Sequence, residues 1–137
     1  MNEDFVPCEL AVKLKEKGFR EECLCHYIGD NLFYNIESPI ANKQLWFSHN
    51  KFDNIWHRDN YDAPTISQAL KWLREEKLIL IALSPTQEYD CNGFIGWCAT
   101  VYKADKQGGM SWQEEFYYQS YELAALVGIE YVLNNLI

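Results

Sequence analysis

Three residues spaced by four positions form the pattern in this chain that is most typical of a metal site. His49, Asp53 and His57 occur in the stretch HNKFDNIWHRD, and on a helix they would share one face. Imidazole with carboxylate is a common ligand set for zinc or iron. Asp59 follows closely and could orient a ligand by hydrogen bonding. The stretch is also rich in Asn and Asp, however, and the same residues fit a solvated loop. We favour the loop, because ligand spacing without a confirmed helix is weak evidence for a metal site.

A second set of potential metal ligands comes from the cysteines and one neighbouring histidine. Cys23, Cys25 and His26 occur together in the stretch CLCH, but a strand would direct the two cysteines to one face and the histidine to the other. A metal site would therefore require a further cysteine from elsewhere in the chain. Small buried thiols are the interpretation we favour, since such cysteines pack as small hydrophobic side chains. The five cysteines are Cys8, Cys23, Cys25, Cys91 and Cys98.

Other patterns that accompany catalysis do not occur in the sequence. It contains no nucleophile elbow, phosphate-binding glycine loop, Cys-x-x-Cys pair or paired-carboxylate motif. Gly108 and Gly109 fit a turn, and Glu114 and Glu115 fit charges on a strand edge or loop. The sequence therefore leans towards a non-catalytic protein without a cofactor.

Length, composition and charge narrow the class of protein further. The 137 residues have the length of one domain, so we expect residues 1–137 to form a single domain. The hydrophobic fraction of 48% excludes a globally disordered chain. No apolar run is long enough to span a bilayer, and the acidic amino terminus lacks the features of a signal peptide. With an odd number of cysteines, these features predict a cytoplasmic protein with reduced thiols and no membrane contact.

Three segments have the periodicity of amphipathic helices. Residues 7–17 start with a proline, which suits a first helical turn, and end with lysines before a glycine. Residues 64–77 repeat apolar residues at helical spacing after a Thr-Ile-Ser-Gln capping pattern. Residues 120–136 start at Ser120, a residue type that caps helices, and form a wide apolar stripe.

Strand patterns lie between these helices. Residues 23–37 indicate two short strands around a Gly-Asp-Asn turn, and residues 78–83 form an apolar run typical of a central strand, which Ser84 and Pro85 would end. In the next strand, Ala99 and Val101 fall on one face, and Thr100 and Tyr102 fall on the other.

The order of these segments predicts the fold class. Residues 38–62 fit a long irregular connection, with one strand at KQLWF as an alternative, and residues 111–119 fit an edge strand. The order α-β-β-α-β-β-α predicts an α+β domain of two layers, with an antiparallel sheet of about four strands and the helices on one face.

The helix over residues 64–77, followed by a strand, is also typical of winged-helix DNA-binding domains. Lys71 and Arg74 on its exposed face could contact phosphates, but the neighbouring Glu75 and Glu76 would repel phosphates. Residues 78–137 contain seven acidic residues and two lysines. The formal net charge of the whole chain is −8, which repels a phosphate backbone, so we expect no nucleic-acid partner.

Three stretches together resemble a family of small uncharacterised proteins common in gut Bacteroides-type bacteria and in their phages and mobile elements. These stretches are EDFVPCELAVKLKEKGF, APTISQALKWLREEK and SYELAALVGIEYVLNNLI. They cover a little over a third of the chain and are specific as a set, although each alone is an ordinary amphipathic helix. No activity is established for that family. The resemblance therefore implies an origin and a fold, and it assigns no catalytic residue.

The last helix carries apolar residues outside its main stripe, namely Leu123, Leu126, Val127 and Tyr131. A helix that is apolar on nearly all sides must be covered twice. The second cover would be another copy of the chain, a different protein, or the loops at residues 38–62 and 104–119. The sequence thus predicts a protein-interaction module, with a homodimer or a basic protein as partner. The alternative is a small metal-binding protein or enzyme that uses the spaced histidines and aspartate.

Overall fold

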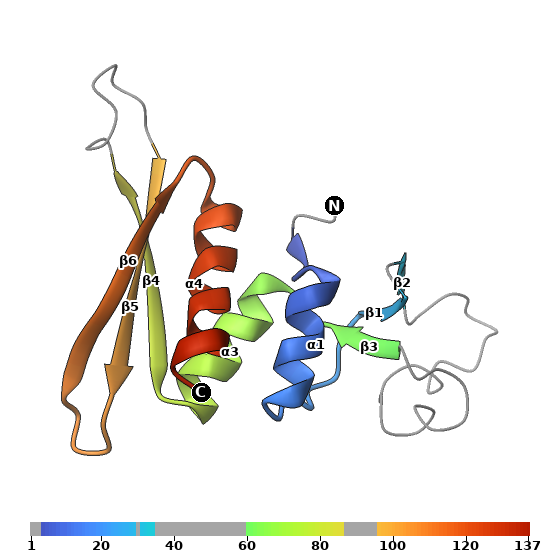
Figure 1. Cartoon of the computed structure of the whole chain (residues 1–137), viewed down its shortest axis with the longest axis horizontal. Coiled ribbons are helices and arrows are strands. Elements are labelled where there is room, and N and C mark those ends of the chain that lie inside the picture. Colours follow the sequence, from blue (N-terminus) through green and yellow to red (C-terminus); the bar gives the residue numbers. More distant parts are fainter. Residues whose placement is uncertain (1–3, 30, 35–59, 87–95) are drawn as a thin grey trace. The chain divides into compact units, whose positions relative to one another are not determined.

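The computed structural model describes residues 4–29, 31–34, 60–86 and 96–137. These residues form three helices and two three-stranded antiparallel sheets, which confirms an α+β protein. The chain divides into two compact units, Met1–Thr65 and Ile66–Ile137, and each unit contains one of the sheets (Figure 1). No helix in the described ranges is long and apolar enough to cross a membrane.

The first unit contains one helix and three short strands. Helix α1 spans Cys8–Glu16, and strands β1, β2 and β3 span Cys25–Ile28, Asn31–Tyr34 and Asn60–Ala63. The strand order is β2-β1-β3. Gly29 has a φ of +60° in the turn between β1 and β2, a conformation that glycine adopts at little cost.

Helix α1 is held at its start by the chain around it. Pro7 occupies the position before the first helical residue, and Leu10 and Leu14 form a buried stripe along the helix. The Tyr27 hydroxyl donates a hydrogen bond to the Val6 carbonyl at 2.7 Å, and the Val6 amide donates to the Pro64 carbonyl at 3.0 Å. These bonds tie the residues before α1 to β1 and to the end of β3.

The second unit contains two helices and three longer strands. Helices α3 and α4 span Ile66–Glu76 and Tyr121–Asn135, and strands β4, β5 and β6 span Ile79–Thr86, Gly96–Ala104 and Met110–Tyr118. The strand order is β4-β5-β6, so β4 and β6 form the two edges of the described sheet.

Both helices of the second unit lie on the same side of its sheet (Figure 1). The Ser120 side chain accepts a hydrogen bond from the Leu123 amide and caps α4, as the sequence predicts. Gly128 lets α4 approach the sheet closely, because a Cβ atom there would lie 3.1 Å from an Ile81 methyl group. Fully buried Leu73, Ile79, Val101, Ile129 and Val132 belong to the core of this unit.

The structure corrects several expectations about the strands. Two three-stranded sheets replace the single sheet of about four strands, and β3 lies at the end of residues 38–62, which we expected to be irregular. In the described part of the sheet, strand β4 lies at an edge rather than in the centre, and it continues through Ser84 and Pro85 instead of ending there. An edge strand tolerates proline because the missing N–H does not need a partner strand on the open side.

Candidate functional site

The set of His49, Asp53 and His57, together with Asp59, lies outside the described residues. Within residues 4–29, 31–34, 60–86 and 96–137, no three His, Cys, Asp or Glu side chains come together in a way that could hold a metal ion. Metal binding by the spaced set therefore stays a prediction.

Burial keeps Cys23 and Cys25 in the neutral thiol form at neutral pH. Both residues are buried, and burial raises the pKa of each thiol above its ordinary value. The carboxylate of Asp62 raises the pKa of Cys23 further. Because the thiolate is the nucleophile and the metal ligand, burial disfavours the reactive form of these two cysteines. Strand β1 begins only at Cys25, so the expected placement of both cysteines on one strand face does not apply.

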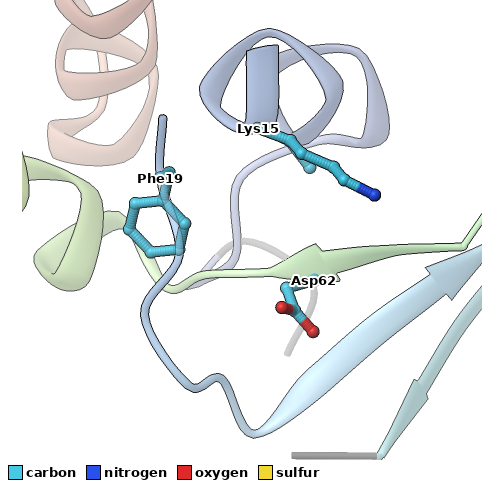
Figure 2. Close-up of a pocket in the computed structure, with 4 residues that line it drawn as sticks. Lys15, Phe19 and Asp62 are labelled. Carbon is cyan, nitrogen blue, oxygen red and sulfur yellow. The ribbon is translucent and has the colours of Figure 1, made fainter. Parts of the chain in front are cut away.

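Strand β3 contributes a buried acid that sequence reasoning missed. Asp62 and His26 are directly opposite each other in the register of β1 and β3, and both residues are buried. A hollow with an empty volume of about 180 Å³, which includes open solvent, is lined by Ala11, Lys15, Phe19 and Asp62 (Figure 2). Pockets for small molecules usually measure about 300–1,000 Å³. The hollow is therefore too small to enclose a drug-sized ligand.

A β-bulge in β6 decides which side chains share the uncovered face of the second sheet. Val101 pairs with Glu114, whereas the next residue, Tyr102, pairs with Trp112, so that Gln113 is an extra residue on β6. One extra residue reverses the alternation of side chains along a strand. Trp112 therefore lies on the same face as Tyr102, with an exposed fraction of 55%. Bulges often re-aim a side chain in this way near functional sites.

The sheet face that α3 and α4 leave uncovered is called the open face below. Strand register places on it three rows that cross all three strands. They are Leu80, Tyr102 and Trp112 in the first, Ala82, Thr100 and Glu115 in the second, and Ser84, Cys98 and Tyr117 in the third. No described element of the second unit covers these rows (Figure 1). The open face therefore presents three aromatic rings and one carboxylate, and none of its rows contains a basic side chain.

Tyr117 and Glu115 form a hydrogen-bonded pair on the open face. The Tyr117 hydroxyl donates to Glu115 Oε2. This hydrogen bond is the largest cause that raises the pKa of Tyr117, followed by burial and the nearby Cys98. The phenol therefore stays neutral at physiological pH, and the hydrogen bond orients the carboxylate.

Helix α4 exposes less of its outer face than the sequence indicates. The exposed fraction of Leu123 is 50%, but Leu126 and Val127 are half-buried. Tyr131 is also half-buried and packs on Phe116 of β6, with 5.4 Å between the ring centroids. The main stripe is buried as predicted, through Ala124, Ala125, Gly128, Ile129, Val132 and Leu133. Interaction through the outer face of α4 stays a prediction, with Leu123 as its most exposed residue.

Sequence reasoning missed the open face because strand alternation alone misplaces Trp112. A regular strand would put Trp112 on the same face as Glu114 and Phe116. Only the register with β5 reveals the bulge. The signal available in the sequence was the density of aromatic residues in SWQEEFYYQ, which marked an edge strand without indicating the directions of its side chains.

Comparison with known proteins does not assign this geometry to a family. No family model, no curated protein and no solved structure matches the chain. The resemblance to small proteins of Bacteroides-type bacteria and their phages therefore stays a prediction. The function has to be argued from the open face itself.

Proposed function

We propose that this chain is a non-catalytic protein-interaction module that binds a basic partner protein through the open face. The observation that carries the proposal is Trp112, which the bulge turns onto a face that no described element of the second unit covers. Tryptophan and tyrosine are the residue types most enriched at protein–protein contacts. An origin in a phage or mobile element, as the resemblance implies, is part of the same proposal.

Exposed aromatic surface supplies the driving force for binding. A buried aromatic side chain removes about 150–250 Å² from water. Trp112 is about half exposed, so a partner could cover roughly 100 Å² of it, which corresponds to about 2.5 kcal/mol at 25 cal/mol per Å². Tyr102 and Tyr117 lie on the same face and would add to this gain.

The distribution of charge indicates the class of partner. Residues 107–137 contain four glutamates and no lysine, arginine or histidine. Two of these glutamates, Glu114 and Glu115, lie on β6 at the border of the open face, so an acidic partner or a phosphate backbone would meet repulsion there. A basic protein surface is complementary to these carboxylates.

A pair of variants at two similarly exposed residues, Trp112 and Leu123, tests the proposal. Trp112→Ser removes the most exposed ring of the open face, and Leu123→Ser removes an exposed side chain of α4. We expect both variants to keep the thermal stability of the parent chain within a few degrees, because surface substitutions change stability by about 0.5 kcal/mol or less. Tagged chains recovered from their natural cell should retain a basic protein in the parent and in Leu123→Ser, and lose it in Trp112→Ser.

Two outcomes would contradict the proposal. In the first, every protein that co-purifies with the parent chain also co-purifies with Trp112→Ser. In the second, the partner is lost only in Leu123→Ser, which would place the contact on α4. The partner that passes this test should then bind the purified chain in a direct titration.

A further inference from the structure

We propose that β6 accepts an extended segment of the partner as a fourth strand, and that this segment carries two adjacent lysine or arginine residues opposite Glu114 and Glu115. The inference rests on the proposed function and specifies how the partner binds. Addition of a strand to an exposed sheet edge is a common mode of peptide recognition, in which backbone hydrogen bonds give affinity and alternate side chains give specificity.

The outer edge of β6 is the sheet edge best suited to this mode. Among the described residues, β6 pairs only with β5, so its other side has no partner strand. Proteins usually protect such edges with lysine or other charged residues, proline or bulges. The bulge at Gln113 interrupts one half of β6, and Glu114 and Glu115 leave the other half open to a strand of opposite charge. Strand β4 contains Pro85, whereas none of the nine residues of β6 is lysine or proline.

The bulge confines the docked segment to one half of β6. Residues 114–118 pair without interruption with residues 97–101 of β5, and the register changes only before Glu114. Five residues are the usual length of a strand in a sheet. The added strand would therefore lie along residues 114–118, beside the second and third rows of the open face.

The two glutamates in this half of β6 define the chemistry of the segment. Glu114 is paired with Val101 on the helix-covered face, and Glu115 is paired with Thr100 on the open face, so their side chains point in opposite directions. Adjacent residues of a docked strand also point in opposite directions. Two consecutive basic residues would thus each meet one carboxylate, and the hydrogen bond from Tyr117 already orients the carboxylate of Glu115.

A second copy of this chain is a poorer occupant of the same edge. Pairing two β6 strands would bring four glutamates to one ladder without a basic side chain in residues 107–137 of either copy. Like charges close together across a ladder destabilise the pairing. A basic segment from a different protein removes this repulsion.

A short synthetic peptide with two adjacent arginines inside alternating threonine and valine residues provides the test. Its binding to the full chain is followed by fluorescence anisotropy, and hydrogen exchange of the chain is compared with and without the peptide. We expect saturable binding, with slower exchange at alternate amides of residues 114–118, because a ladder uses alternate residues on each edge. A peptide with glutamates in place of the arginines should bind at least about tenfold more weakly. A peptide with a central proline should lose the exchange protection, since proline cannot donate to a ladder.

Matched charge reversals locate the binding site. Glu114→Lys combined with Glu115→Lys should lower the affinity of the chain for the arginine peptide by about tenfold or more. Glu75→Lys combined with Glu76→Lys makes the same change of charge at adjacent exposed residues of α3 and should leave binding nearly unchanged. The proposal is overturned if the arginine peptide does not bind, or if both double variants lower its affinity equally. It is also overturned if the free chain already pairs β6 in a dimer. If the natural partner depends on Trp112 but ignores the reversal at Glu114 and Glu115, strand addition fails while the proposed function stands.

Discussion

At the residue scale, Asp105 closes the hairpin that presents the open face. Its Oδ1 accepts hydrogen bonds from the amides of Gln107 at 2.9 Å and Gly109 at 2.8 Å, and its own amide donates to the Gly109 carbonyl at 2.8 Å. A side chain at Gly109 would collide with this arrangement, since a Cβ atom there would lie 2.7 Å from Asp105 Oδ2. The turn thus depends on both residue types.

Replacement of Asp105 by alanine should lower the free energy of unfolding by about 1–2 kcal/mol. Two side-chain hydrogen bonds are lost, each with a net value of about 0.5–1.5 kcal/mol, and water satisfies part of the exposed amides. Chemical denaturation measures the change, and Lys106→Ala in the same exposed turn serves as the control. Equal effects from the two variants would contradict the role assigned to the carboxylate.

The raised pKa of Cys23 predicts that the folded protein loses stability at alkaline pH. In the unfolded chain its thiol ionises near the ordinary pKa of 9.0, whereas burial and Asp62 raise the pKa in the folded protein. Above about pH 9 the unfolded state therefore binds fewer protons than the folded state, and the free energy of unfolding falls as the pH rises. Cys23→Ala should reduce this fall in denaturation curves recorded between about pH 8 and pH 10. An unchanged slope in the variant would show that other groups cause the loss.

At the scale of the elements, periodic patterns in the sequence predicted the features that depend only on nearby residues, namely the helix bounds and the two faces of β5. The helices began and ended close to the predicted residues, and β5 directs Ala99 and Val101 to one face and Thr100 and Tyr102 to the other, as its alternation indicated. The edge position of β4 and the bulge at Gln113 depend on pairing with distant residues. Alternation within one strand does not contain that information, and so the open face could not be predicted from the sequence.

Helix α3 provides a test of its predicted faces. Leu73 is fully buried and Lys71 is exposed. Leu73→Ala should lower the free energy of unfolding by about 2–5 kcal/mol, because it leaves a cavity in a packed core. Lys71→Ala should change it by about 0.5 kcal/mol or less. Similar values from denaturant titrations of the two variants would mean that the helix faces are wrongly assigned.

At the scale of the whole molecule, the acidic charge and the exposed aromatic surface coincide in one part of the sequence. The three rows of the open face span five residues along β5 and two strand spacings across the sheet, roughly 14 Å by 10 Å. This footprint is smaller than the roughly 800 Å² per partner of a standard stable interface. A partner that also adds a strand to β6 would enlarge the contact, and the resulting complex should weaken as salt screens the glutamates.

Self-association through α4 should be weak. Leu123 is half exposed, and burying the rest of a leucine gains about 1 kcal/mol per copy, whereas association costs at least about 4 kcal/mol. Light scattering should therefore give a monomeric mass at micromolar concentration and a rising mass only towards millimolar concentration. Leu123→Glu should abolish the rise. A dimeric mass at micromolar concentration in both chains would contradict this estimate and point to another self-contact.

The most direct test of the central claim is site-specific photocrosslinking in a lysate of the natural cell. An aromatic photoreactive amino acid replaces Trp112 in one chain and the equally exposed Leu123 in another. The account predicts a discrete adduct with one basic protein from position 112, little or no such adduct from position 123, and loss of the adduct when salt is raised before illumination. Adducts from position 123 alone, or none from position 112 in a folded chain, would contradict the claim that the open face binds a partner.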